Sequence, residues 1–297
     1  MYHKPVLLKE SIDAVLVNPD GVYVDVTFGG GGHSREILSR LSEKGRLYSF
    51  DQDMDALGNT IDDPRFTLIN QNFRFLENSL LMYDVTQVDG VLGDLGVSSH
   101  QFDEAERGFS IRSDAPLDMR MNVMQRLNAQ EVINDYEEEH LADIFYYYGE
   151  LREARKLARE IVHKRKEKKI ETTEDLKKVF SYIPAHKSNK FFAQIFQAVR
   201  IEVNQELEAL KEMLQQSSRI LKKGGALVII SYHSLEDRLV KKFLKNGMFE
   251  GEPERDIFGN YDKVFHLPHS KAIIPSDEEI EENSRARSAK MRVGVKL

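Results

Sequence analysis

The sequence predicts an α/β protein with a parallel sheet that is interrupted by a helical insertion. Short β-type runs alternate with amphipathic stretches in the first part of the chain and return near its end, as expected for strands joined by crossover helices. Between these parts the strand pattern gives way to helical apolar spacing. We therefore predict a sheet domain formed by residues 1–103 and 199–297, and a substrate-binding insertion over residues 104–198.

The composition excludes several classes of protein. The chain has 297 residues and no cysteine, which excludes thiol catalysis, disulfides and cysteine metal sites. No apolar run is long enough to cross a bilayer, and the first ten residues lack a signal-peptide core. We expect a cytoplasmic protein that makes no membrane contact. The net charge of −7 argues weakly against a protein that coats nucleic acid, but it leaves a local basic patch open.

A glycine-rich turn follows the first predicted strand. Residues 7–16 have helical spacing, and Val22, Val24 and Val26 then alternate along a strand. Four glycines, residues 29–32, precede a helix predicted over residues 34–41. Because glycine has no Cβ, the amides of such a turn can approach a ligand closely at a helix N-terminus. The turn therefore indicates a cofactor site, and the alternative is a turn made tight only for packing.

The turn departs from the dinucleotide fingerprint. The third glycine of that pattern would stand at position 34, which is Ser34. A dinucleotide needs the helix end for its pyrophosphate, whereas a different loop can hold a smaller, phosphate-free ligand such as S-adenosylmethionine. The sequence therefore favours the smaller cofactor.

Acidic residues end two of the following strands. Asp51 ends the strand predicted over residues 46–51, about twenty residues beyond the glycines, where a carboxylate can meet the ribose hydroxyls. A helix N-cap is the alternative for Asp51, because a helix is predicted from there to about Thr60. Asp94 ends the strand predicted over residues 88–94, and it could hold a reacting amine facing the cofactor. Phe73 follows a strand at residues 65–70 and could lie against an adenine ring, or it could be core.

The insertion combines an irregular loop with several helices. The loop covers residues 106–121 and is rich in charge, and long loops of this kind are usually functional or disordered. Helices are predicted over residues 129–136, 139–148, 151–168 and 173–180, with a capping signal from Thr172 to Asp175.

One stretch of the insertion is strongly basic. Residues 152–169 contain nine basic and three acidic side chains. Such a concentration indicates contact with phosphates, and the alternative is a solvated helix face with ion pairs.

The last part of the chain returns to the sheet. A long amphipathic pattern over residues 192–214 precedes a buried strand within residues 221–233, and residues 234–237 carry a capping signal for the next helix. His233 and Ser234 could contact substrate at the end of that strand. Residues 264–268 and 290–295 could pair as an antiparallel hairpin at the sheet edge. Pro268 separates His266 from His269 and no third ligand is apparent, so we predict no metal site.

Seven blocks of the sequence form one recognisable pattern. They are Thr27–Ser34, Asp94–Ser99, Glu106–Ser110, Pro116–Met121, Phe196–Ile201, Ser231–Arg238 and Arg285–Ser288. Together they resemble the bacterial RsmH (MraW) family, and the resemblance covers nearly the whole chain. It implies a class I (Rossmann-like) fold and an S-adenosylmethionine-dependent methyltransferase. The implied target is the N4 amine of a cytidine in the decoding region of 16S rRNA, in the small ribosomal subunit.

The resemblance also implies roles for particular residues. Cofactor contacts would come from Gly31, Gly32 and His33 to the methionine part, Asp51 to the ribose, Phe73 to the adenine end, and Asp94 and Gln101 near the reacting methyl. Two positions depart from the family pattern. Many relatives have a larger residue in place of Gly30, and His100 stands where relatives often have proline, which makes the placement of Gln101 less secure.

The reaction that the resemblance implies is a direct methyl transfer. The exocyclic amine of cytosine is a poor nucleophile. A group that accepts hydrogen bonds from its N–H groups would favour its attack on the methyl carbon. Asp94 is the candidate catalytic residue for this role, or it holds the cofactor beside the amine. No metal is required, because the sulfonium already activates the methyl group.

Three alternative functions share part of this pattern. A DNA amino-methyltransferase would share the cofactor site, a nicotinamide oxidoreductase is disfavoured by Ser34, and a non-catalytic RNA-binding protein would not need the glycine turn together with Asp51. A homodimer through the insertion is compatible with the sequence, although no apolar stripe indicates one.

Overall fold

The computed structural model describes residues 5–258 and 261–297, and the chain forms two compact units. The first unit joins the described residues up to Gly96 to residues 207–297, and the second spans Val97–Glu206. The segment predicted as an insertion, residues 104–198, lies within the second unit. None of the helices in the described ranges combines the length and the apolar character that a membrane span requires.

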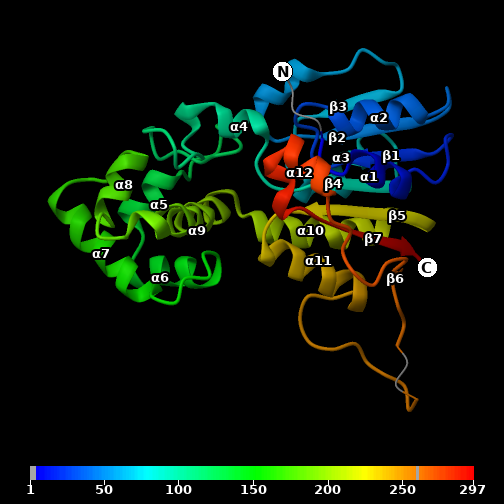
Figure 1. Ribbon diagram of the computed structural model, residues 1–297. Helices are drawn as coiled ribbons and strands as arrows, with labels where there is room; N and C mark the ends of the chain where they lie inside the picture. The colour runs from blue at the N-terminus through cyan, green and yellow to red at the C-terminus, as the bar shows by residue number, and fades with distance from the viewer. Residues whose placement is uncertain (1–4, 259–260) are drawn as a thin grey trace. The chain divides into compact units, whose positions relative to one another are not determined.

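The first unit is built on a seven-stranded sheet in the order β3-β2-β1-β4-β5-β7-β6 (Figure 1). Its first five strands run parallel, β7 is antiparallel to β5, and β6 is antiparallel to β7. The predicted parallel sheet and edge hairpin are therefore confirmed. The strands are β1 (Val22–Asp25), β2 (Arg46–Phe50), β3 (Phe66–Ile69), β4 (Val88–Asp94), β5 (Leu221–Ser231), β6 (Phe265–His266) and β7 (Lys290–Lys296).

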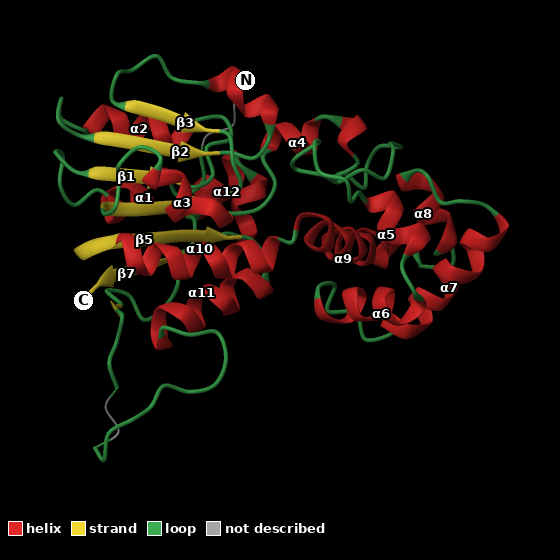
Figure 2. Cartoon of the chain, turned by 180° about the vertical axis from the view of Figure 1, so that it is seen from behind, coloured by secondary structure: helices red, strands yellow, loops and turns green. Residues whose placement is uncertain are grey.

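Helices cover both faces of this sheet (Figure 1, Figure 2). One apolar cluster joins strand residues to helices α3, α10 and α11, and another joins them to α1 and α2. Successive strand residues enter opposite clusters: Val24 and Val91 belong to the first, Tyr23 and Leu92 to the second. The sequences of such strands are nearly continuously apolar, because both faces of the sheet are buried. The helical elements are α1 (Leu8–Val15), α2 (Gly32–Arg40), α3 (Leu76–Leu81), α10 (Glu206–Ile220), α11 (Ser234–Asn246), α12 (Asp277–Glu282) and the 3₁₀ turns η1 (Met54–Asn59), η2 (Phe73–Phe75) and η4 (Ser284–Ser288).

The second unit is helical apart from its long loop. Its core includes the fully buried rings of Phe145 and Phe180. The predicted cap of α8 is confirmed, since the Thr172 side chain accepts a hydrogen bond from the amide of Asp175. The elements are α4 (Ser99–Asp103), η3 (Ala105–Arg107), α5 (Ala129–Asp135), α6 (Glu138–Tyr147), α7 (Ala154–Glu167), α8 (Thr173–Val179) and α9 (Ala185–Asn204).

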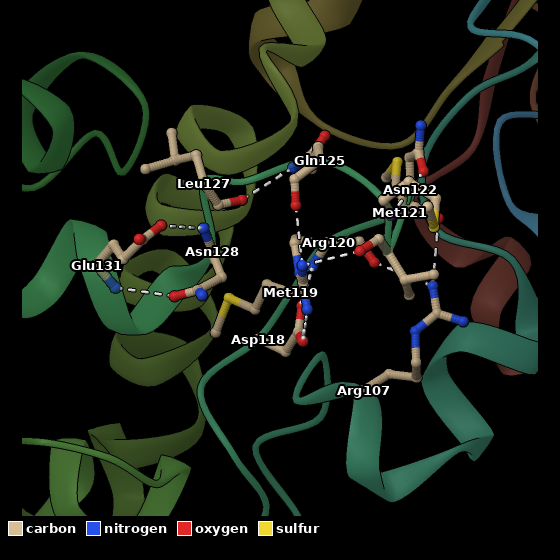
Figure 3. A network of polar contacts seen from close by, with 12 residues as sticks. Arg107, Asp118, Met119, Arg120, Met121, Asn122, Gln125, Leu127, Asn128 and Glu131 are labelled. Atoms are coloured by element: carbon tan, nitrogen blue, oxygen red, sulfur yellow. Dashed lines mark hydrogen bonds and ion pairs between the residues drawn. The ribbon is translucent and has the colours of Figure 1, made fainter.

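Polar contacts hold the irregular loop of the second unit in place (Figure 3). Arg120 forms a two-armed ion pair with Asp118, with both N···O distances 2.7 Å. Arg107 donates to the carbonyl of Arg120 at 3.0 Å. The buried amide of Asn204 accepts from the N–H of Met121 at 2.7 Å and donates to the carbonyl of Met119 at 2.8 Å. Side chains thus provide hydrogen-bond partners for the backbone of this loop, which lacks regular secondary structure.

Three predicted helix features are wrong in detail. The single amphipathic pattern over residues 192–214 is divided between α9 and α10, because Gln205 takes a left-handed conformation with φ of 50°. Arg200 bridges this break by donating to both carboxylate oxygens of Glu206. Apolar periodicity continues across one such residue, so it cannot reveal the break.

The cap of α11 also differs from the prediction. His233, not Ser234, is the N-cap, and it forms a capping box with Glu236. The helix predicted between Asp51 and about Thr60 is only the short η1, which Asp53 caps. In both cases several adjacent polar residues can cap a helix, so the sequence alone does not specify which of them does.

Candidate functional site

The carboxyl ends of the central strands bring the glycine turn and the predicted acids together in the first unit. The turn follows β1, Asp51 follows β2, and Asp94 is the last residue of β4. These strands are parallel neighbours, so their ends share one edge of the sheet, where ligands bind in open α/β folds.

The turn requires glycine at two positions. Gly31 has φ of 76°, and a Cβ there would lie 2.5 Å from Nη1 of Arg35 and 2.9 Å from the ring of Phe28. A Cβ on Gly32 would lie 2.2 Å from the Pro5 ring. Gly31 is also the N-cap of α2 and offers no side-chain cap. The turn is therefore tight, and it leaves the first amides of α2 without a competing side-chain acceptor.

A buried polar network that the sequence analysis missed supports this turn. Asp25 is 1% exposed and accepts hydrogen bonds from the Thr27 amide at 3.0 Å and the Ser34 hydroxyl at 2.7 Å. The Ser34 hydroxyl also lies 2.8 Å from that of Ser49. Ser34, which breaks the dinucleotide fingerprint, thus anchors α2 to β1 and β2. The sequence signal for this network was Asp25, an acidic residue inside an apolar strand, because a buried carboxylate requires hydrogen-bond partners.

Asp51 connects the turn to the second strand. Its carboxylate accepts from the Gly29 amide and from the Asp53 amide, each at 2.8 Å. Burial raises the pKa of Asp51 to about 6 even though both hydrogen bonds favour the ionised form. The alternative interpretation of Asp51 as the helix N-cap is wrong, because Asp53 fills that place.

Asp94 lies between a phenol and an imidazole. The Tyr232 hydroxyl donates to one carboxylate oxygen at 2.7 Å, and Nδ1 of His33 lies 3.8 Å from the other. The Asp94 amide donates to the Thr27 hydroxyl at 2.7 Å. Burial raises the pKa of Asp94 to about 6, opposed by His33 and Tyr232 and assisted by Asp25 and Glu236. Burial and the nearby Asp94 carboxylate raise the pKa of Tyr232 as well, so its hydroxyl stays protonated and donates.

His33 has one ring nitrogen directed toward this carboxylate. Its Nε2 lies 3.1 Å from the carbonyl oxygen of Val6, and a carbonyl can only accept, so Nε2 carries the hydrogen. Nδ1 is then the ring nitrogen that faces the Asp94 carboxylate, at 3.8 Å. His33 is buried, which fixes this arrangement within the site.

The remaining predicted residues, Phe73 and Gln101, belong to different units of the chain. Phe73 begins η2 and packs half-buried against the sheet core, whereas Phe75 is exposed. The side chain of Asn72, beside Phe73, donates to Gln52 at 2.8 Å, which brings this turn next to Asp51. Gln101 belongs to the second unit, where it is buried and forms the capping box of α4 with Ser98.

The two predicted substrate contacts after β5 both lie at the start of α11, with His233 as its N-cap and Ser234 as its first residue. Tyr232, to which the sequence analysis gave no role, is the residue of this segment that reaches Asp94. The only sequence signal for Tyr232 was its place in the block from Ser231 to Arg238.

The raised pKa of Asp94 predicts how stability depends on pH. The ordinary value of 3.8 applies to the unfolded chain, and the folded value is about 6, so the folded state binds the extra proton between them. The free energy of unfolding of the wild type should therefore fall, relative to Asp94→Asn, as the pH rises through this window. We expect the variant to gain about 2 to 3 kcal/mol relative to the wild type between about pH 4 and about pH 7.5. Urea unfolding at both pH values measures this, and a pH-independent difference would contradict it.

Comparison with known proteins gives a consistent result. The sequence model described as the MraW methylase family matches residues 1–297. The chain is 61% identical to the ribosomal RNA small subunit methyltransferase H of Christiangramia forsetii, over 100% of this chain and 98% of that protein. It is 58% identical to the protein of the same name from Flavobacterium johnsoniae and 56% identical to that from Parabacteroides distasonis, in each case over 100% of this chain and 98% of the relative.

Proposed function

The chain belongs to the MraW methylase family, and we propose that it transfers a methyl group from S-adenosylmethionine to the N4 amine of a cytidine in the decoding region of 16S rRNA. The observation that carries this proposal is the placement of Asp94 at the end of β4, held by Tyr232 and facing His33 beside the glycine turn. The relatives are named as small-subunit rRNA methyltransferases, which supports the substrate. The reaction takes place in the cytoplasm, where small subunits are present.

The chain's own residues fit S-adenosylmethionine. Gly31 is the N-cap of α2 and offers no side-chain acceptor to the first amides of the helix, and with Gly32 and His33 it would hold the methionine part. Asp51 would accept hydrogen bonds from the ribose hydroxyls, and Phe73 would lie at the adenine end. Asp94 and Gln101 would lie nearest the transferred methyl group.

The proposed mechanism assigns the proton chemistry to the Asp94 cluster. When bound, the cofactor supplies a methyl group on a positively charged sulfur. Asp94 accepts a hydrogen bond from an N–H of the target amine, and this contact directs the nitrogen lone pair toward the methyl carbon. Tyr232 occupies one carboxylate oxygen and leaves the other, which faces His33, for the amine. The proton that nitrogen loses on methylation passes to this carboxylate and is held beside Nδ1 of His33.

Transfer of a labelled methyl group tests the function. The purified chain is incubated with labelled S-adenosylmethionine and with small ribosomal subunits, naked 16S rRNA or DNA, and the product nucleosides are analysed. Labelled N4-methylated cytidine from a ribosomal substrate alone is expected. Labelled DNA would instead support a DNA amino-methyltransferase, and absence of transfer with intact cofactor binding would overturn the substrate assignment.

We also propose that α7 contacts the RNA. Its buried face is apolar, with Leu157, Ala158 and Ile161 packed in the core, so its basic side chains point outward. Several are paired: Lys164 with Glu167 at 3.1 Å, and Arg159 with Glu138 at 3.4 Å. Ion pairs of the kind that the alternative interpretation expected are thus present along α7. The exposed side chains of Arg155, Lys166 and Lys169 show no ion pair within the described residues.

Charge reversal on α7 tests this contact. Arg165 is unsuitable because it donates to the carbonyls of Ile133 and Tyr136 and so supports the fold. We expect the variant carrying Arg155→Glu, Lys166→Glu and Lys169→Glu to bind small subunits about tenfold or more weakly and to show a shallower salt dependence. Lys44→Glu, which reverses an exposed charge in the first unit, serves as the control. Unchanged affinity and salt slope would refute the role of α7.

Self-association through the second unit remains a prediction. A homodimer would double the molar mass measured by light scattering of the purified chain, and a monomeric mass over the working concentration range would reject it.

A further inference from the structure

A basic pocket lies in the first unit, away from the Asp94 cluster. Its volume is about 470 Å³, and the end of α11, the segment around β6 and strand β7 form its walls. This volume falls within the range of about 300–1,000 Å³ that is usual for ligand sites. None of the sequence blocks that indicate the methyltransferase accounts for it.

The lining combines an apolar floor with a cationic rim. The apolar floor is accessible at the half-buried Tyr261 and Leu267 and at the exposed Leu297, whereas Leu244, Phe265 and Val293 also line the pocket but are nearly fully buried. Four lysines lie at the rim, and among the described lining residues none is acidic; the lysines are Lys241, Lys245, Lys263 and Lys271. They are exposed, and no ion pair involves them in the described part of the chain. Arg292 also lines the pocket, but Asp237 neutralises it at 2.6 Å. This concentration of charge occurs in a chain with a net charge of −7.

Local contacts hold the walls together. The Tyr261 hydroxyl donates to the carbonyl of Lys245 at 2.9 Å, which fixes its ring against the end of α11. Gly247 ends this helix with φ of 73°, and a Cβ there would lie 2.9 Å from Val264. Phe265 pairs with Lys296 across β6 and β7. The ring of Tyr261 and the backbone that carries the lysines are therefore positioned before any ligand arrives.

The pocket is remote from the reacting amine. Helix α11 begins at the carboxyl end of β5 and runs back along the sheet, so Lys245 lies roughly 16 Å along the helix from Ser234. Val293 pairs with Val228, in the middle of β5. A ligand in this pocket therefore does not occupy the site of methyl transfer.

We propose that this pocket binds a second nucleotide of the substrate RNA, with a base on the apolar floor and flanking phosphates at the lysines. Aromatic and aliphatic surfaces stack on any base, and surrounding lysines neutralise the backbone. An anion with a planar apolar group matches both parts of the lining, whereas an acidic peptide would use only the rim. The proposal rests on the proposed rRNA substrate and adds a contact that holds the RNA during transfer.

Removal of three rim charges tests the pocket. In the variant carrying Lys241→Gln, Lys245→Gln and Lys263→Gln, we expect KM for small subunits to rise about tenfold and kcat to stay within about twofold. The slope of log affinity against log salt should become shallower by about 2, since each phosphate contact to a single strand contributes about 0.7. The matched control carries Lys242→Gln, Lys44→Gln and Lys223→Gln, which removes the same charge outside the pocket. Equal behaviour of the two variants would overturn the proposal.

Lysine modification provides a readout that needs no methyl transfer. Small subunits or 16S rRNA should protect the four rim lysines of the wild type from acetylation, as measured by mass spectrometry, and leave Lys44 reactive. Protection by cytidine monophosphate alone at micromolar concentration, or by polyglutamate but not RNA, would overturn the proposal in favour of a free nucleotide or an acidic protein. If the wild type transfers no methyl to any rRNA substrate, the proposed function fails; if it does so while the rim variant behaves as its control, only the pocket proposal fails.

Discussion

Replacing Asp94 by asparagine is expected to slow methyl transfer by about 10²- to 10³-fold, with a change in S-adenosylmethionine affinity of less than about tenfold. Asparagine keeps the size of the side chain and one oxygen for the Tyr232 hydroxyl, which lies 2.7 Å away. It lacks the negative charge of the carboxylate, which accepts the hydrogen bond from the amine and then the departing proton. Single-turnover transfer to small subunits and calorimetric cofactor binding separate these two effects.

The neighbours of Asp94 provide the matched control. Tyr232→Phe removes one hydrogen bond to Asp94 and leaves the carboxylate in place, so we expect a loss of only about tenfold. The rate of this variant should also depend on pH differently from the wild type, since Tyr232 stabilises the ionised carboxylate. An Asp94→Asn protein with wild-type rate and wild-type cofactor affinity would reject both proposed roles of Asp94.

Replacing Asp51 by alanine is expected to raise the Kd for S-adenosylmethionine by about 100-fold. Hydrogen bonds to a charged acceptor contribute about 1.5–3 kcal/mol each, and the variant loses those to the ribose. It also leaves the amides of Gly29 and Asp53 without their acceptor, which loosens the turn. Calorimetric titration of the cofactor measures the change.

Two further substitutions show whether the loss of affinity is specific to the Asp51 carboxylate. Asp55→Ala removes an exposed carboxylate four residues along the chain, and we expect it to leave cofactor affinity within about twofold of the wild type. Asp51→Asn keeps an acceptor oxygen and should fall between the wild type and Asp51→Ala. Wild-type affinity in a folded Asp51→Ala protein would remove Asp51 from the cofactor site.

Most of the fold could be predicted from the sequence because its elements are locally consistent. The strand ending at Asp94 and the edge hairpin are found where apolar runs and turn residues indicated them. The errors lie at single residues. Gln205 interrupts a periodic pattern without changing its period, and His233 takes the cap that Ser234 could equally have filled.

The order of the elements, the glycine turn and the two acids at strand ends follow from the sequence alone, because each depends on residues close together in the chain. The contacts of these acids depend on the packing of the folded chain. Tyr232 reaches Asp94 across 138 positions of sequence, because β4 and β5 are neighbours in the sheet. The basic pocket likewise joins α11 to β6 and β7. Such partners have no local pattern to predict them, since packing alone brings distant segments within the few ångströms over which hydrogen bonds and charges act.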